Sequence, residues 1–472
     1  MFFLETLKIT VLNLVLAIAT LLPQNSVSMG LVGDPISFLP HEAQITSEQM
    51  ISDLVFRKLF KYRDGEMVND LVESWDISDD SKLYNFKLKA NVYWQDGVPI
   101  TSNDVIYTLT MNQSLRDEIE IEKISDKEVS ISLQTPNAIL PSLLTFSIEP
   151  AHITNQQKLM PIGSTSYRIS RVMMERNKVR GVILQSFQRG KLYNKIYFHF
   201  YDTDNDLKTA YKLGEIYAFF SNSEFSYPHL NSKPITFIGR YFSLIFNTTA
   251  KELSTPEVRT VLAKSLNTDE LLQRNYFRNS LKAQGPISYS PYTRDDFKTP
   301  YYNPEVKLTE NQKSLFEDEL KILLPNSQDG RQLEDFLKSS WQEQLGLKLE
   351  FQYYDVNELI SKGKSGEFGV ILVGHEVTPD PDRYAFWHSS QMANLNLANF
   401  EDLRADRALE EGRRVFNSDD RILHYNIFQD VIFTKVPAVF LYHPGTFLYT
   451  SEKTPIPLPQ GVYTPSDILE SL

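Results

Sequence analysis

The chain contains no cysteine, and this absence narrows its chemistry more than any other feature of its composition. Disulfides, zinc–thiolate sites, iron–sulfur clusters and thiol catalysis are excluded, as is lipid attachment through an N-terminal cysteine. Basic residues are in the minority: 48 Lys and Arg stand against 60 Asp and Glu, which gives a formal net charge of −12. Because nucleic-acid binding needs clustered Lys and Arg, and no basic stripe is present, we expect no nucleic-acid partner.

Motifs for nucleotide, metal and covalent chemistry are also missing. Gly363-Lys-Ser365 has the ending of a phosphate-binding loop, but Glu358 stands where that loop needs glycine. Asp202 to Asp206 imitates the start of a calcium loop, yet Leu207 and Leu213 occupy its glycine and glutamate positions, so a helix N-cap is favoured. No G-x-S-x-G or H-E-x-x-H motif occurs, and the eight histidines are scattered. We therefore expect no cofactor, no metal and no enzyme activity.

The length and the composition favour a large protein that contains both helices and strands. With 472 residues, the chain is long enough for two or three core-forming units. Predicted strands and helices alternate throughout, which favours an α/β architecture. Its 24 Tyr and 29 Phe are explained either as ordinary core and surface aromatics or as the lining of a binding cleft.

The pattern of the N-terminus predicts an export signal or a membrane anchor. Ile9–Leu22 contains no charge, follows Lys8, and precedes small residues at Ser26-Val-Ser28 that are spaced like a signal-peptidase site. The run is short for a membrane span, which needs about 20 apolar residues. Cleavage after Ser28 would remove part of a predicted first strand, Val27–Val32, so the anchor is slightly favoured. A buried N-terminal helix is the third interpretation.

The segment Leu71–Val105 has the most regular local pattern in the chain. Asp79-Asp-Ser81 predicts a turn, and the alternation of apolar and polar residues over Lys82–Lys89 predicts a half-buried strand. Thr101 followed by Asp104 predicts a capping box at the start of a helix. These features alone describe a rigid scaffold without reactive groups.

The order of residues in Leu71–Val105 resembles the signature of family 5 extracellular solute-binding proteins, the peptide-type receptors of ABC importers. That pattern runs LAESW-x-x-SDDG, then an alternating strand, then V-x-W-x-DG-x-P-(L/I)-T-(A/S)-x-DV, and Trp94 matches its second tryptophan. Ser81 stands where the pattern usually has glycine, so we expect a turn that needs no positive φ at this position. Weaker matches in the same order extend the resemblance over residues 30–450.

The resemblance implies an α/β, two-lobed clamshell of the periplasmic-binding-protein type II kind, with a small α+β subdomain inserted in the N-terminal lobe. The implied parts are a signal peptide or anchor at 1–26, lobe I at 27–46 and 161–240, the inserted subdomain at 47–160, lobe II at 241–440, and a return to lobe I at 441–472. Binding is expected to occur by hinge closure between the lobes.

The implied function is that of an extracytoplasmic receptor of an ABC importer for peptides or similar small solutes. Its partners would be that ligand, the permease subunits and, through the N-terminal segment, the membrane. The receptor is expected to be a monomer. Two alternatives remain: an extracellular hydrolase-type enzyme that uses loop carboxylates, and a receptor scaffold that has lost transport.

Candidate ligand-binding residues gather around the loop Gly374–Asp382, which follows a predicted buried strand that begins at Val370. In the resembled family this region lines the cleft, and an acidic residue there holds a peptide's α-amino group. Val377 or Thr378 falls near the position of that acid, and Glu376 is a neighbouring substitute. The full set that we assign to ligand binding is Phe38, Tyr241, Phe242, Asn247, Glu376, Asp380, Asp382 and Trp387. The other interpretation is core packing for the aromatic residues and a solvated acidic turn for the carboxylates.

Overall fold

The computed structural model describes residues 25–112, 119–188, 190–294, 302–392, 394–459 and 461–470. The chain divides into two compact units: unit 1 comprises the residues up to Ile235 and those from Thr446 onward, and unit 2 comprises Thr236–Gly445. The chain therefore passes from one unit to the other twice. The predicted signal peptide or anchor, residues 1–26, falls outside the described residues apart from its last two positions. Within the described ranges, no helix combines the length and the apolarity needed to span a bilayer.

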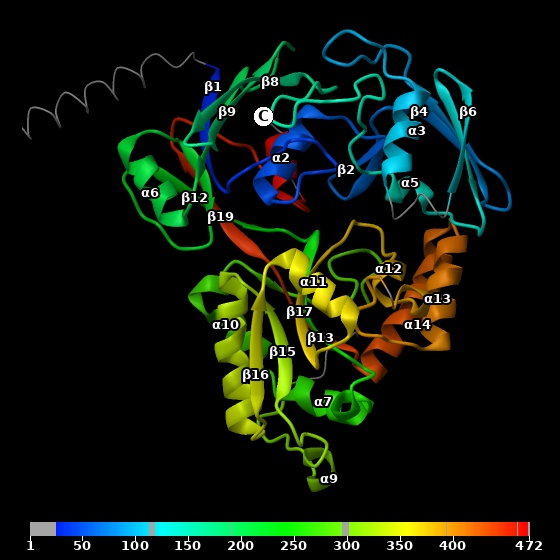
Figure 1. Ribbon diagram of the computed structural model, residues 1–472, viewed down its shortest axis with the longest axis vertical. Coiled ribbons are helices and arrows are strands. Elements are labelled where there is room, and N and C mark those ends of the chain that lie inside the picture. The colour runs from blue at the N-terminus through cyan, green and yellow to red at the C-terminus, as the bar shows by residue number, and fades with distance from the viewer. Residues whose placement is uncertain are drawn as a thin grey trace, which may run out of the picture. The chain divides into compact units, whose positions relative to one another are not determined.

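Unit 1 is built on a seven-stranded sheet whose order is β12-β19-β11-β1-β10-β9-β8 (Figure 1). The strand β1 (Ser26–Val32) lies inside this sheet and pairs in parallel with β10 and β11. The remaining strands are β8 (Tyr167–Glu175), β9 (Lys178–Ser186), β10 (Lys195–Tyr201), β11 (Ala218–Ser221), β12 (Leu230–Thr236) and β19 (Gly445–Ser451).

The helix α6 (Asp204–Leu213) packs on this sheet through Leu207 and Tyr211, which contact Phe219 and Tyr449. Its ends follow the sequence pattern. Thr203 accepts a hydrogen bond from the Asp206 backbone N–H, and Gly214 ends the helix with a φ of 76°. The acidic run before the helix therefore forms the N-cap that the sequence favoured.

A smaller group of elements completes unit 1. A four-stranded sheet has the order β4-β5-β7-β6, and β2 and β3 form a separate hairpin. These strands are β2 (Phe60–Arg63), β3 (Glu66–Asn69), β4 (Val72–Ile77), β5 (Leu83–Leu88), β6 (Ile119–Ser125) and β7 (Glu128–Leu133). The accompanying helices are α2 (Thr46–Val55), α3 (Ser102–Met111), α5 (Leu140–Leu143) and α15 (Pro465–Glu470).

The signature segment forms the strand and helix that its pattern predicts. In β5, Tyr84, Phe86 and Leu88 are buried while the alternate residues are exposed. The backbone N–H of Thr101 donates to the Asp104 carboxylate at 2.7 Å, which forms one half of the capping box of α3.

Two local predictions are wrong. Ser81 has a φ of 55°, so the turn does need a positive φ although glycine is absent. Ser81 is held there because its N–H donates to the Ser78 carbonyl and its carbonyl accepts from Asn137. The second concerns residues 49–60, where the apolar spacing of Met50, Ile51, Leu54, Val55 and Leu59 predicts a helix. In the structure α2 ends at Val55, and Phe60 begins a strand. Apolar spacing alone does not mark where a buried helix gives way to a buried strand.

Unit 2 contains a six-stranded sheet of order β14-β18-β13-β17-β15-β16. The strands are β13 (Arg240–Phe246), β14 (Leu281–Lys282), β15 (Leu320–Pro325), β16 (Leu349–Tyr354), β17 (Val370–Glu376) and β18 (Ala438–His443). The helices are α7 (Pro256–Lys264), α8 (Thr268–Gln273), α9 (Glu310–Lys313), α10 (Gln328–Leu337), α11 (Val356–Ser365), α12 (Tyr384–Trp387), α13 (Leu403–Arg414) and α14 (Ser418–Lys435). A π-helical stretch, η3 (Lys338–Gln344), continues α10, and η1 (Lys251–Leu253), η2 (Asn275–Phe277) and η4 (Ser389–Gln391) are single 3₁₀ turns.

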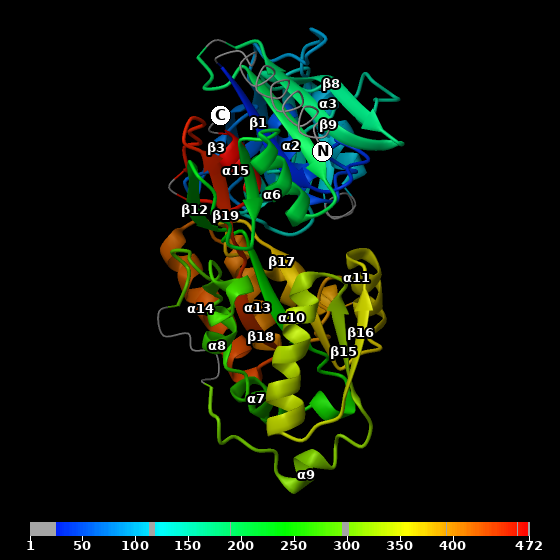
Figure 2. The ribbon, with the colours of Figure 1, turned by 90° about the vertical axis from the view of Figure 1, so that its left-hand side faces the viewer.

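The central strand β13 serves a separate core on each face of this sheet. Phe242, Leu244 and Phe246 pack with α7 and α10, whereas Tyr241 and Ile245 pack with the helices α11, α13 and α14. Figures 1 and 2 show α10 and the pair α13–α14 on different sides of the strands. Because successive side chains of a strand point to opposite faces, a strand covered on both sides is apolar throughout, as the sequence Arg240–Asn247 nearly is.

Trp94 provides a test of unit 1. Its side chain is 2% exposed and packs edge-on against Phe56, with 6.5 Å between the ring centroids. Trp94→Ala should lower the free energy of unfolding by about 3–5 kcal/mol, because the truncation leaves a cavity. Tyr93→Ala is the matched control, since Tyr93 is 52% exposed and its loss should change stability little. Chemical denaturation followed by circular dichroism measures both, and equal midpoints would contradict the burial of Trp94.

Candidate functional site

Seven of the eight predicted ligand-binding residues lie in unit 2, and Phe38 lies in unit 1. Phe38 is fully buried and stacks on Phe200 at a centroid distance of 6.4 Å. Its backbone N–H donates to the Lys158 carbonyl at 2.7 Å. These contacts place Phe38 in the packing of its own unit, and its assignment to ligand binding stays a prediction.

An aromatic cluster forms where three strands of unit 2 end together. Because β13 runs antiparallel to both β17 and β18, the start of β13 meets the ends of the other two strands. Tyr241 is paired with His375 in the β13–β17 register, and their rings stack with 4.8 Å between centroids. Phe386 and Trp387, from α12, pack against His375, and His443 packs against Tyr241. We call Tyr241, His375, Phe386, Trp387 and His443 the strand-end cluster.

Two histidines in this cluster are buried and uncharged. His375 is 2% exposed and His443 is 1% exposed. Burial, with a smaller contribution from nearby Arg383, lowers the pKa of His375 to about 3 and that of His443 to about 4. The Nε2 atom of His375 lies 3.0 Å from the Ser243 hydroxyl. Both imidazoles are therefore neutral at physiological pH.

Phe242 and Asn247 face other parts of unit 2. Phe242 points to the opposite side of β13 from Tyr241 and stacks on Tyr442 with 5.1 Å between centroids. Asn247 is buried, and its amide donates to the carbonyls of Gly366 at 2.9 Å and Phe368 at 3.0 Å. These bonds tie the end of β13 to the turn before β17, so the Asn247 side chain stabilises the scaffold.

Glu376 ends β17 next to the strand-end cluster, and it is exposed. Its carboxylate forms an ion pair with Arg240, its partner in the β13–β17 register. The side chain of Glu376 is 63% exposed and that of Arg240 is 38% exposed. Since exposed ion pairs contribute little stability, a charged ligand group could replace either partner at small cost.

Asp380 and Asp382 are already bound by arginines. Asp380 accepts two hydrogen bonds from Arg421, at 3.0 and 2.9 Å, and Asp382 accepts three from Arg413, at 3.1, 3.1 and 2.7 Å. All four side chains are at most 15% exposed. The two carboxylates therefore anchor the loop to α13 and α14, and the hydrolase interpretation loses its proposed acid and base.

Four further residues of this region, Arg240, Arg383, Tyr289 and His443, are not among those predicted from the sequence. Arg383 is 4% exposed, and the ring of Tyr289 packs on His443 with 5.2 Å between centroids. The only available signal was local: Arg240 begins the largely apolar run Arg240–Asn247, and Arg383 follows the acidic loop. Their neighbours come from distant parts of the chain, which periodicity does not reveal.

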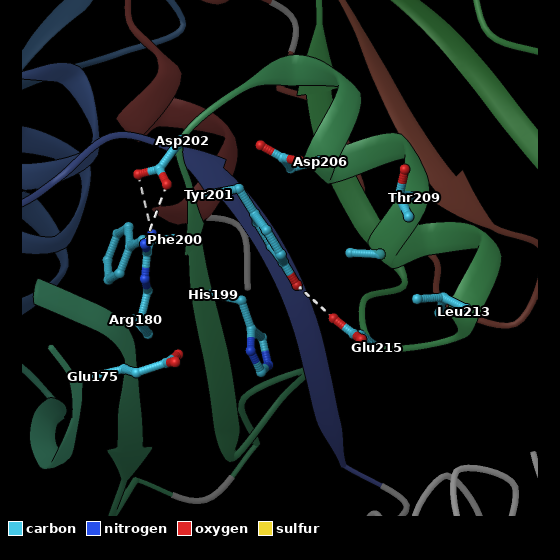
Figure 3. Close-up of a pocket in the computed structure, with 11 residues that line it drawn as sticks. Glu175, Arg180, His199, Phe200, Tyr201, Asp202, Asp206, Thr209, Leu213 and Glu215 are labelled. Atoms are coloured by element: carbon cyan, nitrogen blue, oxygen red, sulfur yellow. Dashed lines mark hydrogen bonds and ion pairs between the residues drawn. The ribbon is translucent and has the colours of Figure 1, made fainter. Parts of the chain in front are cut away.

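Unit 1 carries a separate acidic hollow with a cavity volume of about 480 Å³, shown in Figure 3. Arg180 donates to both carboxylate oxygens of Asp202 at 3.1 Å, and the Tyr201 hydroxyl donates to Glu215 at 3.2 Å. Burial lowers the pKa of His199, which lies between them. The complete lining is Glu175, Arg180, His199, Phe200, Tyr201, Asp202, Asp206, Thr209, Ala210, Leu213 and Glu215.

The buried histidines predict a loss of stability in acid. In the unfolded chain a histidine has a pKa near 6.5, so below that pH the unfolded state binds protons that folded His375 and His443 exclude. Their contribution is complete above about pH 6.5 and decreases towards about pH 3, by up to about 1.4 kcal/mol per pH unit for each histidine. Urea denaturation between pH 7.5 and 4.5 measures this slope.

His443→Phe should flatten that pH dependence, because it keeps a ring in the cluster and removes one titrating group. His229→Gln is the control: the His229 side chain is 81% exposed and should leave the slope unchanged. A slope that is the same in His443→Phe and in the parent protein would contradict the assignment.

Comparison with known proteins places this arrangement in a family. The family model for bacterial extracellular solute-binding proteins, family 5, matches residues 66–395. The dipeptide-binding protein of Escherichia coli (strain K12) is 20% identical over 473 residues, covering 83% of this chain and 84% of that protein.

Solved structures share the fold at similarly low identity. DppA from Helicobacter pylori in complex with the peptide STSA has a TM-score of 0.77 at 17% identity and covers 94% of this chain and 98% of its own. NikZ from Campylobacter jejuni in complex with Ni(L-His) has a TM-score of 0.73 at 19% identity and covers 91% of this chain and 95% of its own. The expected clamshell fold is thereby confirmed. From the sequence match and the shared fold together, the chain belongs to family 5 of the bacterial extracellular solute-binding proteins.

Proposed function

We propose that this protein is the receptor of an ABC importer and captures a peptide or a similar small solute outside the cytoplasm. The observation that carries the proposal is the family match over residues 66–395, to which the named ligands of the relatives add a chemical range. Those ligands are a dipeptide, the peptide STSA and a nickel–histidine complex. Each is a small, polar solute that carries charged groups.

The proposed binding residues are those at the end of β17. Glu376 and Arg240 form an exposed ion pair there, beside the buried rings of the strand-end cluster. An exposed carboxylate at this position is suited to a ligand ammonium group, because the two charges would attract at little desolvation cost. Asp380 and Asp382 would act indirectly, by holding the loop in place through Arg421 and Arg413.

Transport would follow from a change in domain closure. The chain passes between the two units twice, near residues 235 and 445, and these passages are the proposed hinge. A ligand favours the closed form only to the extent that it binds that form more tightly than the open one. The permease would then recognise the closed receptor, and the N-terminal segment would export it or tether it to the membrane. No covalent step is required.

Native mass spectrometry tests the ligand class. Protein purified without denaturation should carry a small solute whose mass identifies it, and a synthetic sample of that solute should raise the melting temperature. Saturation at a hundredfold excess over Kd corresponds to about 2.7 kcal/mol of stabilisation. A protein that retains no solute, and that no peptide or metal chelate stabilises, would contradict the proposal.

Glu376→Gln and Asp380→Asn separate direct binding from support of the loop. Glu376→Gln should weaken binding of a cationic or zwitterionic solute while leaving the melting temperature unchanged, since Glu376 is exposed. Asp380→Asn should instead destabilise the protein by about 3–5 kcal/mol, because it leaves Arg421 as an uncompensated buried charge. Calorimetry of binding and thermal denaturation distinguish the two variants, and undiminished affinity in Glu376→Gln would remove that residue from the site.

A further inference from the structure

The β8–β9 hairpin and the segment that leads from it to β10 carry a local excess of positive charge. Residues 167–195 contain eight Lys and Arg but a single acidic residue, Glu175, in a chain whose net charge is −12. The basic residues are Arg168, Arg171, Arg176, Lys178, Arg180, Arg189, Lys191 and Lys195. The expectation that the chain has no basic stripe is therefore wrong for this hairpin, because the net charge of a whole chain does not show where the charges gather.

The positive charge near the turn of this hairpin is paired, whereas three charges at its open end are not. Near the turn, Arg180 donates two hydrogen bonds to the Asp202 carboxylate, each at 3.1 Å. At the open end, Arg168, Arg171 and Lys195 form no ion pair within the described part of the chain. Uncompensated positive charge therefore gathers where β8 and β10 begin and β9 ends.

These charges share one end and one face of the seven-stranded sheet. Arg168 and Lys195 both lie opposite Gln185, one on each side of β9, and Lys195 is also the register partner of Ser26 in β1. Figure 1 shows β1, β9 and β8 in the same part of the sheet. Because directly opposite residues of antiparallel strands point to the same face, the two cations lie on one surface although they come from different strands.

Exposed apolar side chains are interleaved with the charges. The Arg168 guanidinium lies 4.0 Å from the centroid of the Phe187 ring, and the Lys191 ammonium lies 5.3 Å from that of Tyr167. Phe187 is 59% exposed and Leu192 is 41% exposed. We call this surface the basic edge, and it consists of Arg168, Arg171, Phe187, Lys191, Leu192 and Lys195. The combination of Lys and Arg with exposed Phe and Leu is the one that binds peripheral segments to anionic membranes.

The basic edge lies beside the point where the N-terminal segment joins unit 1. The Asn25 carbonyl accepts hydrogen bonds from the backbone N–H groups of Asn194 at 2.8 Å and Lys195 at 3.3 Å. The apolar run Ile9–Leu22 ends three residues before Asn25. Three residues span at most about 10 Å, and the Debye length in 0.1 M salt is also about 10 Å. A membrane that held this run would therefore lie within electrostatic reach of the basic edge.

We propose that the basic edge docks unit 1 on the surface of a membrane that contains anionic phospholipid. Its Lys and Arg side chains would contact lipid phosphates, and Phe187 and Leu192 would enter the boundary between headgroups and acyl chains. Duplex nucleic acid offers only phosphates to this edge, whereas a bilayer also buries the exposed apolar side chains. The docking itself needs no tether, and the idea that the N-terminal segment brings the edge to the membrane rests on the proposed function.

A single introduced cysteine reports docking, because the chain has no other cysteine to label. The full chain with Gln188→Cys, next to Phe187, carries an environment-sensitive fluorophore and is mixed with vesicles of phosphatidylcholine, with or without phosphatidylglycerol. Emission should rise more on the anionic vesicles than on the neutral ones, and spin-labelled lipid should quench it. This difference should disappear in 1 M salt, where the Debye length falls to about 3 Å. Met174→Cys is the control probe: Met174 is 53% exposed, lies near the hairpin turn and should show no such difference.

Paired charge variants locate the docking surface. Arg168→Gln with Lys195→Gln should shift the docking equilibrium on anionic vesicles roughly 25-fold towards the undocked state, since each basic residue near such a surface contributes about fivefold. Arg176→Gln with Lys178→Gln is the matched control, because it removes the same charge near the turn and should leave the response unchanged. Both pairs should keep the melting temperature of the parent protein, since exposed charges add little stability. Phe187→Ala should also weaken docking, although it changes no charge.

Equal responses of the parent protein to anionic and neutral vesicles would overturn the docking surface, as would an unchanged response in the Arg168 and Lys195 variant. A DNA duplex that reproduces the response to anionic vesicles, with no loss in Phe187→Ala, would assign the edge to nucleic acid instead. Flotation with neutral vesicles tests the tether separately. A chain that does not float with neutral vesicles but responds to anionic ones would contradict the tether and support the docking surface, while the mass of the retained solute still decides the receptor function.

Discussion

The antiparallel pairing of β13 with both β17 and β18 is the constraint on which the candidate site depends. This register places Arg240 opposite Glu376 and Tyr241 opposite His375, and it brings His443 to the same edge of the sheet. A shift of one residue would move the aromatic side chains to the other face of the sheet, where α7 and α10 pack. The backbone pairing of these strands therefore positions both the Arg240–Glu376 ion pair and the strand-end cluster.

Arginine–carboxylate pairs hold the loop that follows β17 onto this edge. Arg421 and Arg413 come from α14 and α13, and both pairs are largely removed from water. Buried pairs of this kind add little net stability, but breaking one is costly, so they fix position more than they add stability. Because Asp380 and Asp382 are both paired, Arg383 is left without a carboxylate partner in this loop. The local charge therefore depends on which residues pair, and not only on how many acidic and basic residues are present.

The solved structures show that one fold occurs with chemically different ligands. Identities of 17–19% accompany TM-scores of 0.73–0.77, so the framework is retained while most side chains differ. Apolar positions of the two lobes accept many substitutions of similar volume. Ligand chemistry is set instead by a few polar groups on loops and strand ends, which is why one framework occurs with a peptide in one protein and with a nickel complex in another.

Local patterns in the sequence predicted much of the framework. The strand over residues 82–89 and the capping box at Thr101 and Asp104 occur as expected. Each of these features depends on residues only a few positions apart, so the sequence alone shows its pattern. The positive φ of Ser81 was missed because a hydrogen-bonded serine can hold a conformation that glycine usually supplies.

By itself, the amino-acid sequence determined the family, the α/β class and the absence of thiol chemistry. Only the tertiary structure decided which charges are paired: Asp380 meets Arg421 from 41 residues away, and Asp382 meets Arg413 from 31 residues away. It likewise decided that His375 and His443 are buried beside Tyr241, although the sequence shows only scattered histidines. The physical reason is that a carboxylate or an imidazole can pair with many partners, and packing of distant elements selects the one that it meets.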